Sequence, residues 1–180
     1  SSDVCSSDLG LGPVGMGAIA VSKFLGARVI ALDSVPFRKN MAKEMGADVV
    51  LDPTDPDIKE KIREAKKDAP LIKAVDASGN GNAERLCIDM MEPRGSVAFI
   101  GENHNTIPIC PSDDFIRKGL TLMGSWHYNM DDREEMFAIL RRSPVVHKII
   151  TDVYGFSDVQ GAFEKFMGQD TCKVILKPWE

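Results

Sequence analysis

Gly10-Leu11-Gly12-Pro13-Val14-Gly15 decides the fold, because its glycines recur at the spacing of a turn that joins a buried strand to a helix. Gly10 permits a tight turn, Gly12 lets the backbone approach a phosphate, and Gly15 lets the helix pack close to a sheet. Residues 16–25 hold one glycine and otherwise no helix breaker, so we expect them to form that helix. The free N–H groups and the positive dipole end of its N-terminus would face a phosphate.

An acidic residue stands where such a unit needs one. Arg28-Val29-Ile30-Ala31-Leu32 is a short apolar run that predicts a strand, and Asp33 follows it directly. Turn, helix, strand and acid in this order are typical of a dinucleotide-binding βαβ unit. Asp33 would accept hydrogen bonds from the ribose hydroxyls and repel a 2′-phosphate, which favours NAD over NADP. The glycine pattern alone would also fit a glycine-rich turn of another α/β fold.

The residues before the turn do not fit this unit. A buried strand of a parallel sheet is normally a nearly continuous apolar run, but residues 1–8 are mostly polar. They contain no initiator Met and no secretory signal pattern. We therefore expect residues 1–8 to be foreign, either a cloning scar or sequence acquired where a larger gene was cut, and the chain to be a fragment. The full gene should encode an apolar strand at this place.

Composition indicates a globular protein. The 180 residues are 43% hydrophobic, enough for one full core and a small extension. The net charge of −5 argues against a nucleic-acid partner or an anionic membrane, and no apolar run approaches the ~20 residues that span a bilayer. The four cysteines are far apart, so a local zinc knuckle is not predicted. We expect Cys87 and Cys172 to be buried in a reduced, cytoplasmic protein.

Strand and helix patterns alternate through the first two thirds of the chain. Counting the polar first strand, six strands are predicted, with helices on both faces of a parallel sheet. The fold class is thus α/β, a Rossmann domain over residues 9–128, with ligands at the carboxyl ends of the strands. The further strands are expected at 49–51, 71–75, 96–100 and 120–123, and the helices at 36–45, from Asp55 onward, at 82–91 and at 113–118.

Residues 129–180 behave differently. A helix is expected at 131–141 and a strand at 149–154. Ser157 and Gln160 form a capping-box pattern for a further helix, and 173–177 is a closing strand. A strand, helix and strand beyond a complete sheet indicate a return into a neighbouring domain, so we expect part of this segment's apolar surface to be exposed.

Four stretches together resemble one family. They are the glycine turn with Pro13, Lys43-Glu44-Met45-Gly46-Ala47-Asp48, Asp76-Ala77-Ser78-Gly79, and Lys173-Val174-Ile175-Leu176. The combination, which spans residues 9–180, resembles the zinc-dependent medium-chain dehydrogenase/reductase family of the alcohol dehydrogenase superfamily. Asp33 followed five residues later by Arg38 is similar to its polyol branch, the sorbitol or L-iditol dehydrogenases.

The resemblance implies a two-domain enzyme that oxidises an alcohol to a carbonyl and passes a hydride to NAD. In this family the catalytic zinc is a Lewis acid whose ligands lie mostly in a domain before the glycine turn. The resemblance therefore places no catalytic residue and no metal ligand in this chain. It also implies that residues 129–180 belong to an absent GroES-like catalytic domain.

The resemblance assigns cofactor-binding roles residue by residue. The turn would meet the pyrophosphate, Asp33 would bind the adenosine ribose, and Arg38 would orient that acid or stack on adenine. The residues after the fifth strand would hold the nicotinamide, and those after the sixth would close over its carboxamide and face the substrate. The full set is Gly10, Gly12, Pro13, Val14, Gly15, Asp33, Arg38, Ser78, Ile100, Gly101, Glu102, Ser125, Trp126 and His127.

Plainer interpretations stay open for two of these residues. His127 is more simply explained as a loop histidine at a domain boundary, and Arg38 is explained equally well as a solvated helix charge.

The sequence thus predicts the cofactor-binding portion of a zinc-dependent polyol or sugar-alcohol dehydrogenase, inactive alone. The resemblance implies a homo-oligomer in the full enzyme. Three alternatives remain: a zinc-free quinone or enoyl reductase that prefers NADPH, a non-catalytic NAD(H)-sensing Rossmann module, and a threonine or glucose dehydrogenase of the zinc family.

Overall fold

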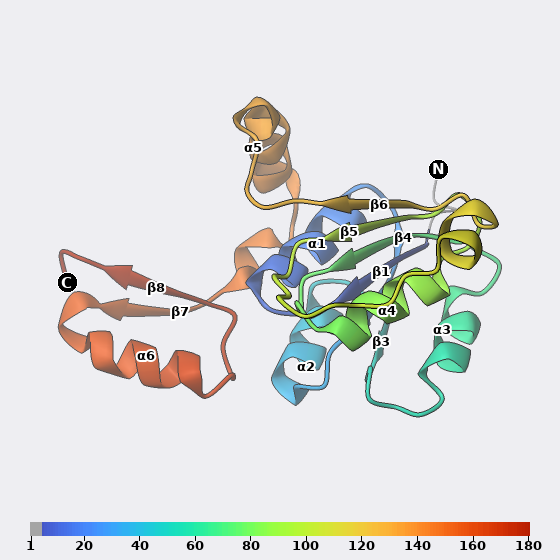
Figure 1. The fold of residues 1–180 in the computed structure, drawn as a ribbon. Helices are drawn as coiled ribbons and strands as arrows, with labels where there is room; N and C mark the ends of the chain where they lie inside the picture. Colours follow the sequence, from blue (N-terminus) through green and yellow to red (C-terminus); the bar gives the residue numbers. More distant parts are fainter. Residues whose placement is uncertain (1–4) are drawn as a thin grey trace.

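A six-stranded parallel sheet forms the centre of the molecule (Figure 1). The computed structural model describes residues 5–180. The strand order β3-β2-β1-β4-β5-β6 reverses direction at β1, as in a doubly wound sheet. The strands are β1 (Cys5–Leu9), β2 (Arg28–Leu32), β3 (Val49–Leu51), β4 (Leu71–Asp76), β5 (Ser96–Phe99) and β6 (Thr121–Gly124).

Helices cover both faces of this sheet and divide its core into two clusters. On one face α1 and α2 bury Met16, Ile19 and Met45 against β2. On the other face α3 and α4 bury Ile62 and Ile88 against the strands. The helices are α1 (Pro13–Phe24), α2 (Pro36–Glu44), α3 (Ile58–Lys66), α4 (Gly81–Met90), α5 (Arg133–Arg142) and α6 (Val159–Met167), with short helical turns at Pro111–Ile116, Met130–Asp132, Val146–Ile149 and Phe156–Asp158. The predicted Rossmann fold is confirmed.

Strand β1 is a polar strand in the middle of an otherwise apolar sheet. It pairs with β2 and β4, and Ser6, Ser7 and Asp8 are buried. Asp8 has no exposed surface, and its Oδ2 atom finds no hydrogen-bond partner in the described part of the chain. Burial raises the pKa of Asp8 to about 7. Backbone pairing thus includes residues 5–8 of the stretch expected to be foreign, while residues 1–4 lie outside the described residues.

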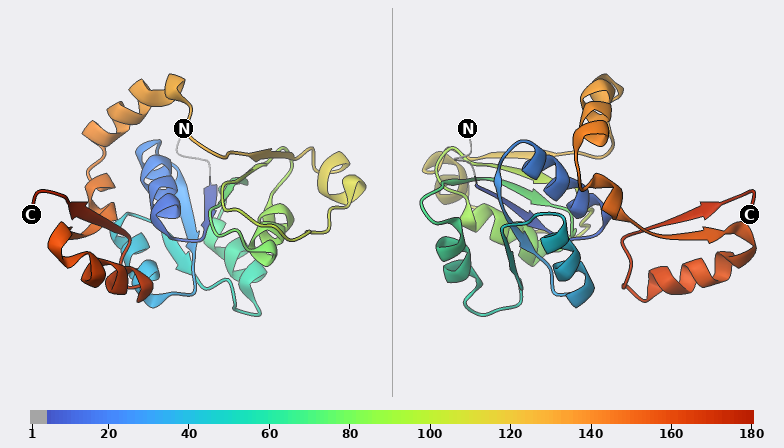
Figure 2. Two further views of the ribbon diagram at one scale, coloured as in Figure 1. Left: turned by 60° about the vertical axis from the view of Figure 1, so that its left-hand side comes forward. Right: turned by 180° about the vertical axis from the view of Figure 1, so that it is seen from behind.

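The C-terminal residues form a second, smaller unit. Strands β7 (Ile150–Gly155) and β8 (Lys173–Lys177) pair in parallel, and α6 connects them and packs on one side. The right-hand view of Figure 2 shows that this unit extends away from the sheet. Its link to the body is residues 145–149, which pack on the α1 and α2 cluster, and Lys148 Nζ donates to the Glu44 carbonyl at 3.1 Å.

Helix α1 begins at Pro13, three residues before the predicted start, and the caps of two other helices differ from the sequence prediction. Asp55 was expected to cap α3, but its carboxylate accepts from Asp57 N at 2.9 Å, so a turn precedes the helix and Asp57 stands at the cap position. At α6 the cap is Asp158, which accepts from Gly161 N at 3.3 Å, in place of the predicted Ser157 and Gln160 pair. None of the helices in the described part is long and apolar enough to cross a membrane.

Candidate functional site

A cleft of about 650 Å³ opens where β1, β2 and β4 end. Five of the predicted site residues line it: Gly10, Gly12, Asp33, Arg38 and Ser78. The remaining lining comes from the neighbouring strand ends and loops: Leu9, Leu32, Ser34, Val35, Pro53, Thr54, Ala77, Asn80, Asn82, Ala83, Leu86 and Gln169. The cleft therefore lies at the carboxyl edge, where the strand order reverses and where doubly wound folds bind their ligands.

Backbone contacts lock the turn between β1 and α1. Gly10 has a φ of +83°, and a Cβ atom there would lie 2.6 Å from Ser78 Cα, so glycine is required. Gly10 N donates to the Leu32 carbonyl at 3.1 Å, and Leu11 N donates to Asp33 Oδ2 at 2.8 Å. The glycine turn is thus tied to the strand end that carries the acid.

The N-terminus of α1 leaves room for a phosphate. Gly12 stands at the cap position with no side chain to cap the helix, and Pro13 occupies the first turn. A Cβ atom on Gly12 would meet nothing within 4 Å, so the missing side chain leaves open space beside the backbone N–H groups. Val14 is half exposed at this end, whereas Gly15 is buried against the Gly10 carbonyl. This geometry fits a pyrophosphate.

Asp33 is buried and held in a fixed orientation. Only 6% of it is exposed, and its second carboxylate oxygen, Oδ1, accepts from Val35 N at 2.8 Å. Each carboxylate oxygen keeps a second lone pair, which a ribose hydroxyl could use. Arg38 Nη1 lies 3.7 Å from Asp33 Oδ2, and Arg38 Nε is buried with no hydrogen-bond partner among the described residues. An unpartnered donor beside a fixed acceptor fits the hydroxyls and oxygens of a nucleotide.

A second cleft of about 560 Å³ follows the ends of β5 and β6. Six further predicted residues, Ile100, Gly101, Glu102, Ser125, Trp126 and His127, line it together with Phe99 and Gly124, whereas Pro13, Val14 and Gly15 line neither cleft. The loops that line the two clefts are in backbone contact: Gly79 lies between Ser78 and Asn80 of the first cleft, and a Cβ atom on Gly101 of the second would lie 2.2 Å from Gly79 N. Two adjoining clefts along one sheet edge match the two linked halves of a dinucleotide.

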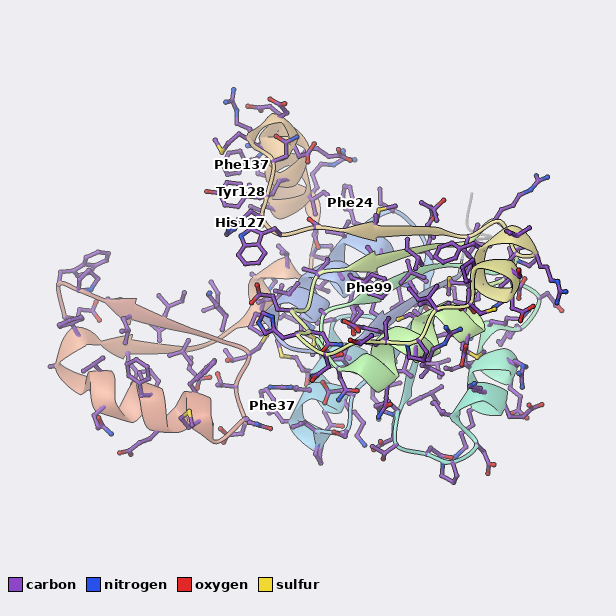
Figure 3. All side chains as sticks on the ribbon, viewed as in Figure 1. Phe24, Phe37, Phe99, His127, Tyr128 and Phe137 are labelled. Carbon is purple, nitrogen blue, oxygen red and sulfur yellow. The ribbon has the colours of Figure 1, made fainter. Side chains whose placement is uncertain are left out.

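The far wall of the second cleft is exposed. Figure 3 shows His127 and Tyr128 at the corner where β6 passes toward α5, near Phe137. The Trp126 and His127 rings meet edge to face with centroids 5.4 Å apart, and Trp126 is 74% exposed. The structure therefore places His127 on the cleft that was predicted for the nicotinamide, but in an open loop.

Several cleft residues were missed by the sequence reasoning. Asn80 lines the first cleft and caps α4, where its Oδ1 accepts from Asn82 N at 3.0 Å. Pro53 and Thr54 follow β3 in the same way. A search of every residue after a strand end would have found these three. Gln169 carries no such signal, because it comes from a distant segment.

Metal ligands do not gather in the part of the chain that the structure describes. Residues 6–180 contain no group of three His, Cys, Asp or Glu side chains arranged to hold a metal. Cys87 and Cys172 are buried among apolar residues, as predicted, and burial raises the pKa of both thiols.

Comparison with known proteins agrees with this geometry. The family model for zinc-binding dehydrogenases matches residues 13–142. L-threonine 3-dehydrogenase from Caldanaerobacter subterraneus subsp. tengcongensis is 28% identical over 94% of this chain and 50% of its own length. D-arabitol-phosphate dehydrogenase from Enterococcus avium is 25% identical over 94% of this chain and 49% of its own. The chain thus spans about half the length of the curated relatives it matches.

A solved structure shares the fold. A short chain alcohol dehydrogenase from Escherichia coli CFT073, in complex with NADH, superposes with a TM-score of 0.84 at 21% identity, over 97% of this chain and 52% of that one. The family model covers well over half of the 180 residues. The family predicted from the sequence is confirmed, and the chain belongs to the zinc-binding dehydrogenases.

Proposed function

We propose that this chain is the NAD-binding portion of a zinc-dependent dehydrogenase that converts a secondary alcohol, of the polyol or sugar-alcohol class, to a ketone. The observation that carries the proposal is Asp33, buried at a strand end and held by the N–H groups of Leu11 and Val35. Its fixed carboxylate would take both ribose hydroxyls and leave no room for a 2′-phosphate. NAD is therefore the cofactor, which accepts the hydride when bound.

The chain's own residues bind and orient. The N–H groups beside Gly12 would hold the pyrophosphate, and Asp33 with Arg38 would fix the adenosine half. The loops after β5 and β6 would then hold the nicotinamide in the second cleft. Holding the nicotinamide ring in a fixed orientation against the substrate makes the reaction effectively unimolecular and so lowers its entropic barrier. We assign zinc and its ligands to the part of the relatives that this chain does not match, so we expect cofactor binding without turnover from this chain alone.

The C-terminal unit supports the second half of this proposal. Helix α6 and strand β8 line an apolar hollow of about 240 Å³, formed by Ala162, Phe163, Phe166, Val174 and Leu176. Phe163 is 60% exposed and Phe166 is 53% exposed. We propose that this surface packs against the catalytic domain of the full enzyme.

The cellular setting follows from the same proposal. We place the enzyme in the cytoplasm, because its buried thiols need no oxidant, and we expect a homo-oligomer. Edge strand β6 supports the oligomer, since Met123 is 48% exposed there and the strand has a free side for pairing.

Threonine oxidation is the second candidate, favoured by the similarity to L-threonine 3-dehydrogenase. The full-length enzyme would separate the two, because it should reduce NAD with sorbitol or a related polyol and not with L-threonine. Turnover with L-threonine alone would replace the polyol assignment.

Calorimetric titration with NADH and NADPH tests the cofactor assignment. Asp33→Gly should weaken NADH binding about tenfold or more, the size expected for losing hydrogen bonds to a charged group. It should also raise the relative affinity for NADPH, because Arg38 would then face the 2′-phosphate without its acidic neighbour. Asp33→Asn, which keeps the shape of the side chain, should give an intermediate loss.

Asp48 offers a matched control. It also accepts a backbone N–H bond, from Val29 at 2.8 Å, and pairs with Lys23 at 2.7 Å, but it lies at the opposite end of β2. Asp48→Asn should leave NADH affinity unchanged. Equal losses in the Asp33 and Asp48 variants, or a preference of the unaltered chain for NADPH, would contradict the proposal and favour the zinc-free reductase branch.

A further inference from the structure

The turn after α6 reaches the first cleft from the C-terminal unit. Every described residue of the cleft lining lies between Leu9 and Leu86 except Gln169. Figure 1 shows the end of α6 and the turn after it on the side of the unit that faces α2. A residue from the last strand–helix–strand unit thus joins a cleft that is otherwise built by the Rossmann domain.

The backbone of Gln169 is held in an unfavourable conformation. Its φ is +58°, in the left-handed region that glycine and asparagine adopt more readily than glutamine. Gln169 N donates to the Phe166 carbonyl at 3.2 Å. Such a conformation costs about 1 kcal/mol and persists where surrounding contacts fix it.

Contacts on both sides fix this turn. Cys172 N donates to Thr151 Oγ1 at 3.0 Å, and the Thr151 and Thr171 hydroxyls lie 2.6 Å apart. Cys172 is 4% exposed and belongs to the core cluster of α1 and α2. The turn is therefore anchored to β7 and to the body of the molecule at once.

The turn that carries Gln169 lies near α2, the helix that carries Arg38. The neighbouring residue Asp170 lines a different hollow, together with Phe37 and Asn40 of α2. The turn therefore lies against two sides of α2. Burial raises the pKa of the Cys172 thiol to about 11, and the nearby positive charge of Arg38 acts in the opposite direction. Both observations bring the turn beside Arg38.

We propose that Gln169 is a cofactor-binding residue, whose side-chain amide hydrogen-bonds the adenosine half of NAD, at its ribose or pyrophosphate oxygens. The amide offers two donors and an acceptor without charge, so it complements Asp33 and Arg38 in the same cleft. Because the turn is anchored to β7, bound cofactor also holds the C-terminal unit against the Rossmann domain. This inference rests on the proposed NAD site.

The test compares Gln169→Gly with the unaltered chain. Glycine removes the amide and relaxes the positive φ, so the variant should melt at a higher temperature and yet bind NADH about five- to tenfold more weakly. ADP-ribose, which lacks the nicotinamide, should lose affinity by the same factor. Gln169→Glu, which adds a negative charge facing the phosphates, should lose more, and its loss should shrink as salt is added.

Gln160→Ala is the matched control, because Gln160 lies on α6 and bonds Glu164 Oε1 at 3.1 Å outside the cleft. It should bind NADH as the unaltered chain does. Unchanged NADH and ADP-ribose affinity in both Gln169 variants, with normal binding by the unaltered chain, would overturn this inference and leave the NAD site standing. No binding by the unaltered chain would overturn both.

Discussion

The sheet body and the C-terminal unit contain the same elements, parallel strands joined by a helix, but bury them differently. In the body, helices cover both faces, and Ile30, Leu32 and Val97 have no exposed surface. In the C-terminal unit α6 covers one side only, and Val153 is 52% exposed on β7. The difference shows that the body completes its own core, whereas the unit presents an apolar surface that the rest of an enzyme could cover.

Strand β1 is the exception within the body, because it buries polar side chains. Its Asp8 gives the largest effect that we expect on the free energy of unfolding. Asp8 titrates at about 7 in the folded chain against an ordinary value of 3.8. Between these values the folded state holds more protons than the unfolded state, so the free energy of unfolding should fall as pH rises from about 4 to about 7. The loss is about 4 kcal/mol and levels off above pH 7.

Urea unfolding at a series of pH values measures this slope. Asp8→Asn, which cannot ionise, should abolish it, and Asp8→Val should make the chain more stable at neutral pH. A variant with the slope of the unaltered chain would show that another group titrates.

Core truncation compares the body and the C-terminal unit directly. Ile62→Ala, at a position 1% exposed in the body, should cost about 3 kcal/mol. Phe163→Ala, at a position 60% exposed in the C-terminal unit, should change stability by less than about 0.5 kcal/mol. Chemical denaturation of both variants provides the values. A cost at Phe163 as large as at Ile62 would mean that the unit has a closed core of its own.

Gly15 and Gly17 allow a crowded position and an open position to be compared within one helix, α1. A Cβ atom on Gly15 would lie 2.0 Å from the Gly10 carbonyl oxygen, so Gly15→Ala should cost about 2 kcal/mol and disturb the phosphate turn. A Cβ atom on Gly17 would meet nothing within 4 Å, so Gly17→Ala should stabilise the helix by about 0.5 kcal/mol. Thermal melts of the pair test this, and equal effects of the two substitutions would rule out the close approach at Gly15.

Local patterns were sufficient to predict much of the site. Gly12 and Asp33 were predictable because each sits at a strand or helix boundary that its own neighbours define, and the fold brings such boundaries to one edge. Gln169 was not, because its place depends on how a unit over 130 residues away docks beside Arg38. The start of α3 also could not be predicted from helix propensity alone. The Asp55 carboxylate accepts a hydrogen bond from Asp57 N, and the resulting turn moves the start of the helix.

Strand β1 was difficult to predict from the sequence for a different reason. Its polar residues argued against a buried strand, yet backbone pairing with β2 and β4 includes them. The backbone hydrogen bonds along a parallel ladder do not depend on the side chains. The glycine turn and the neighbouring strands therefore determine where β1 lies, and the buried polar side chains determine how much stability is lost.

The most direct test of the central claim is an NADH titration of the isotope-labelled chain, followed through its backbone amide resonances. We predict that the amides of Gly12, Val14 and Val35 shift together and saturate, while that of Val29, at the opposite end of β2, does not move. Shifts confined to other surfaces, or no shifts at all, would contradict a cofactor site at the carboxyl edge of this sheet.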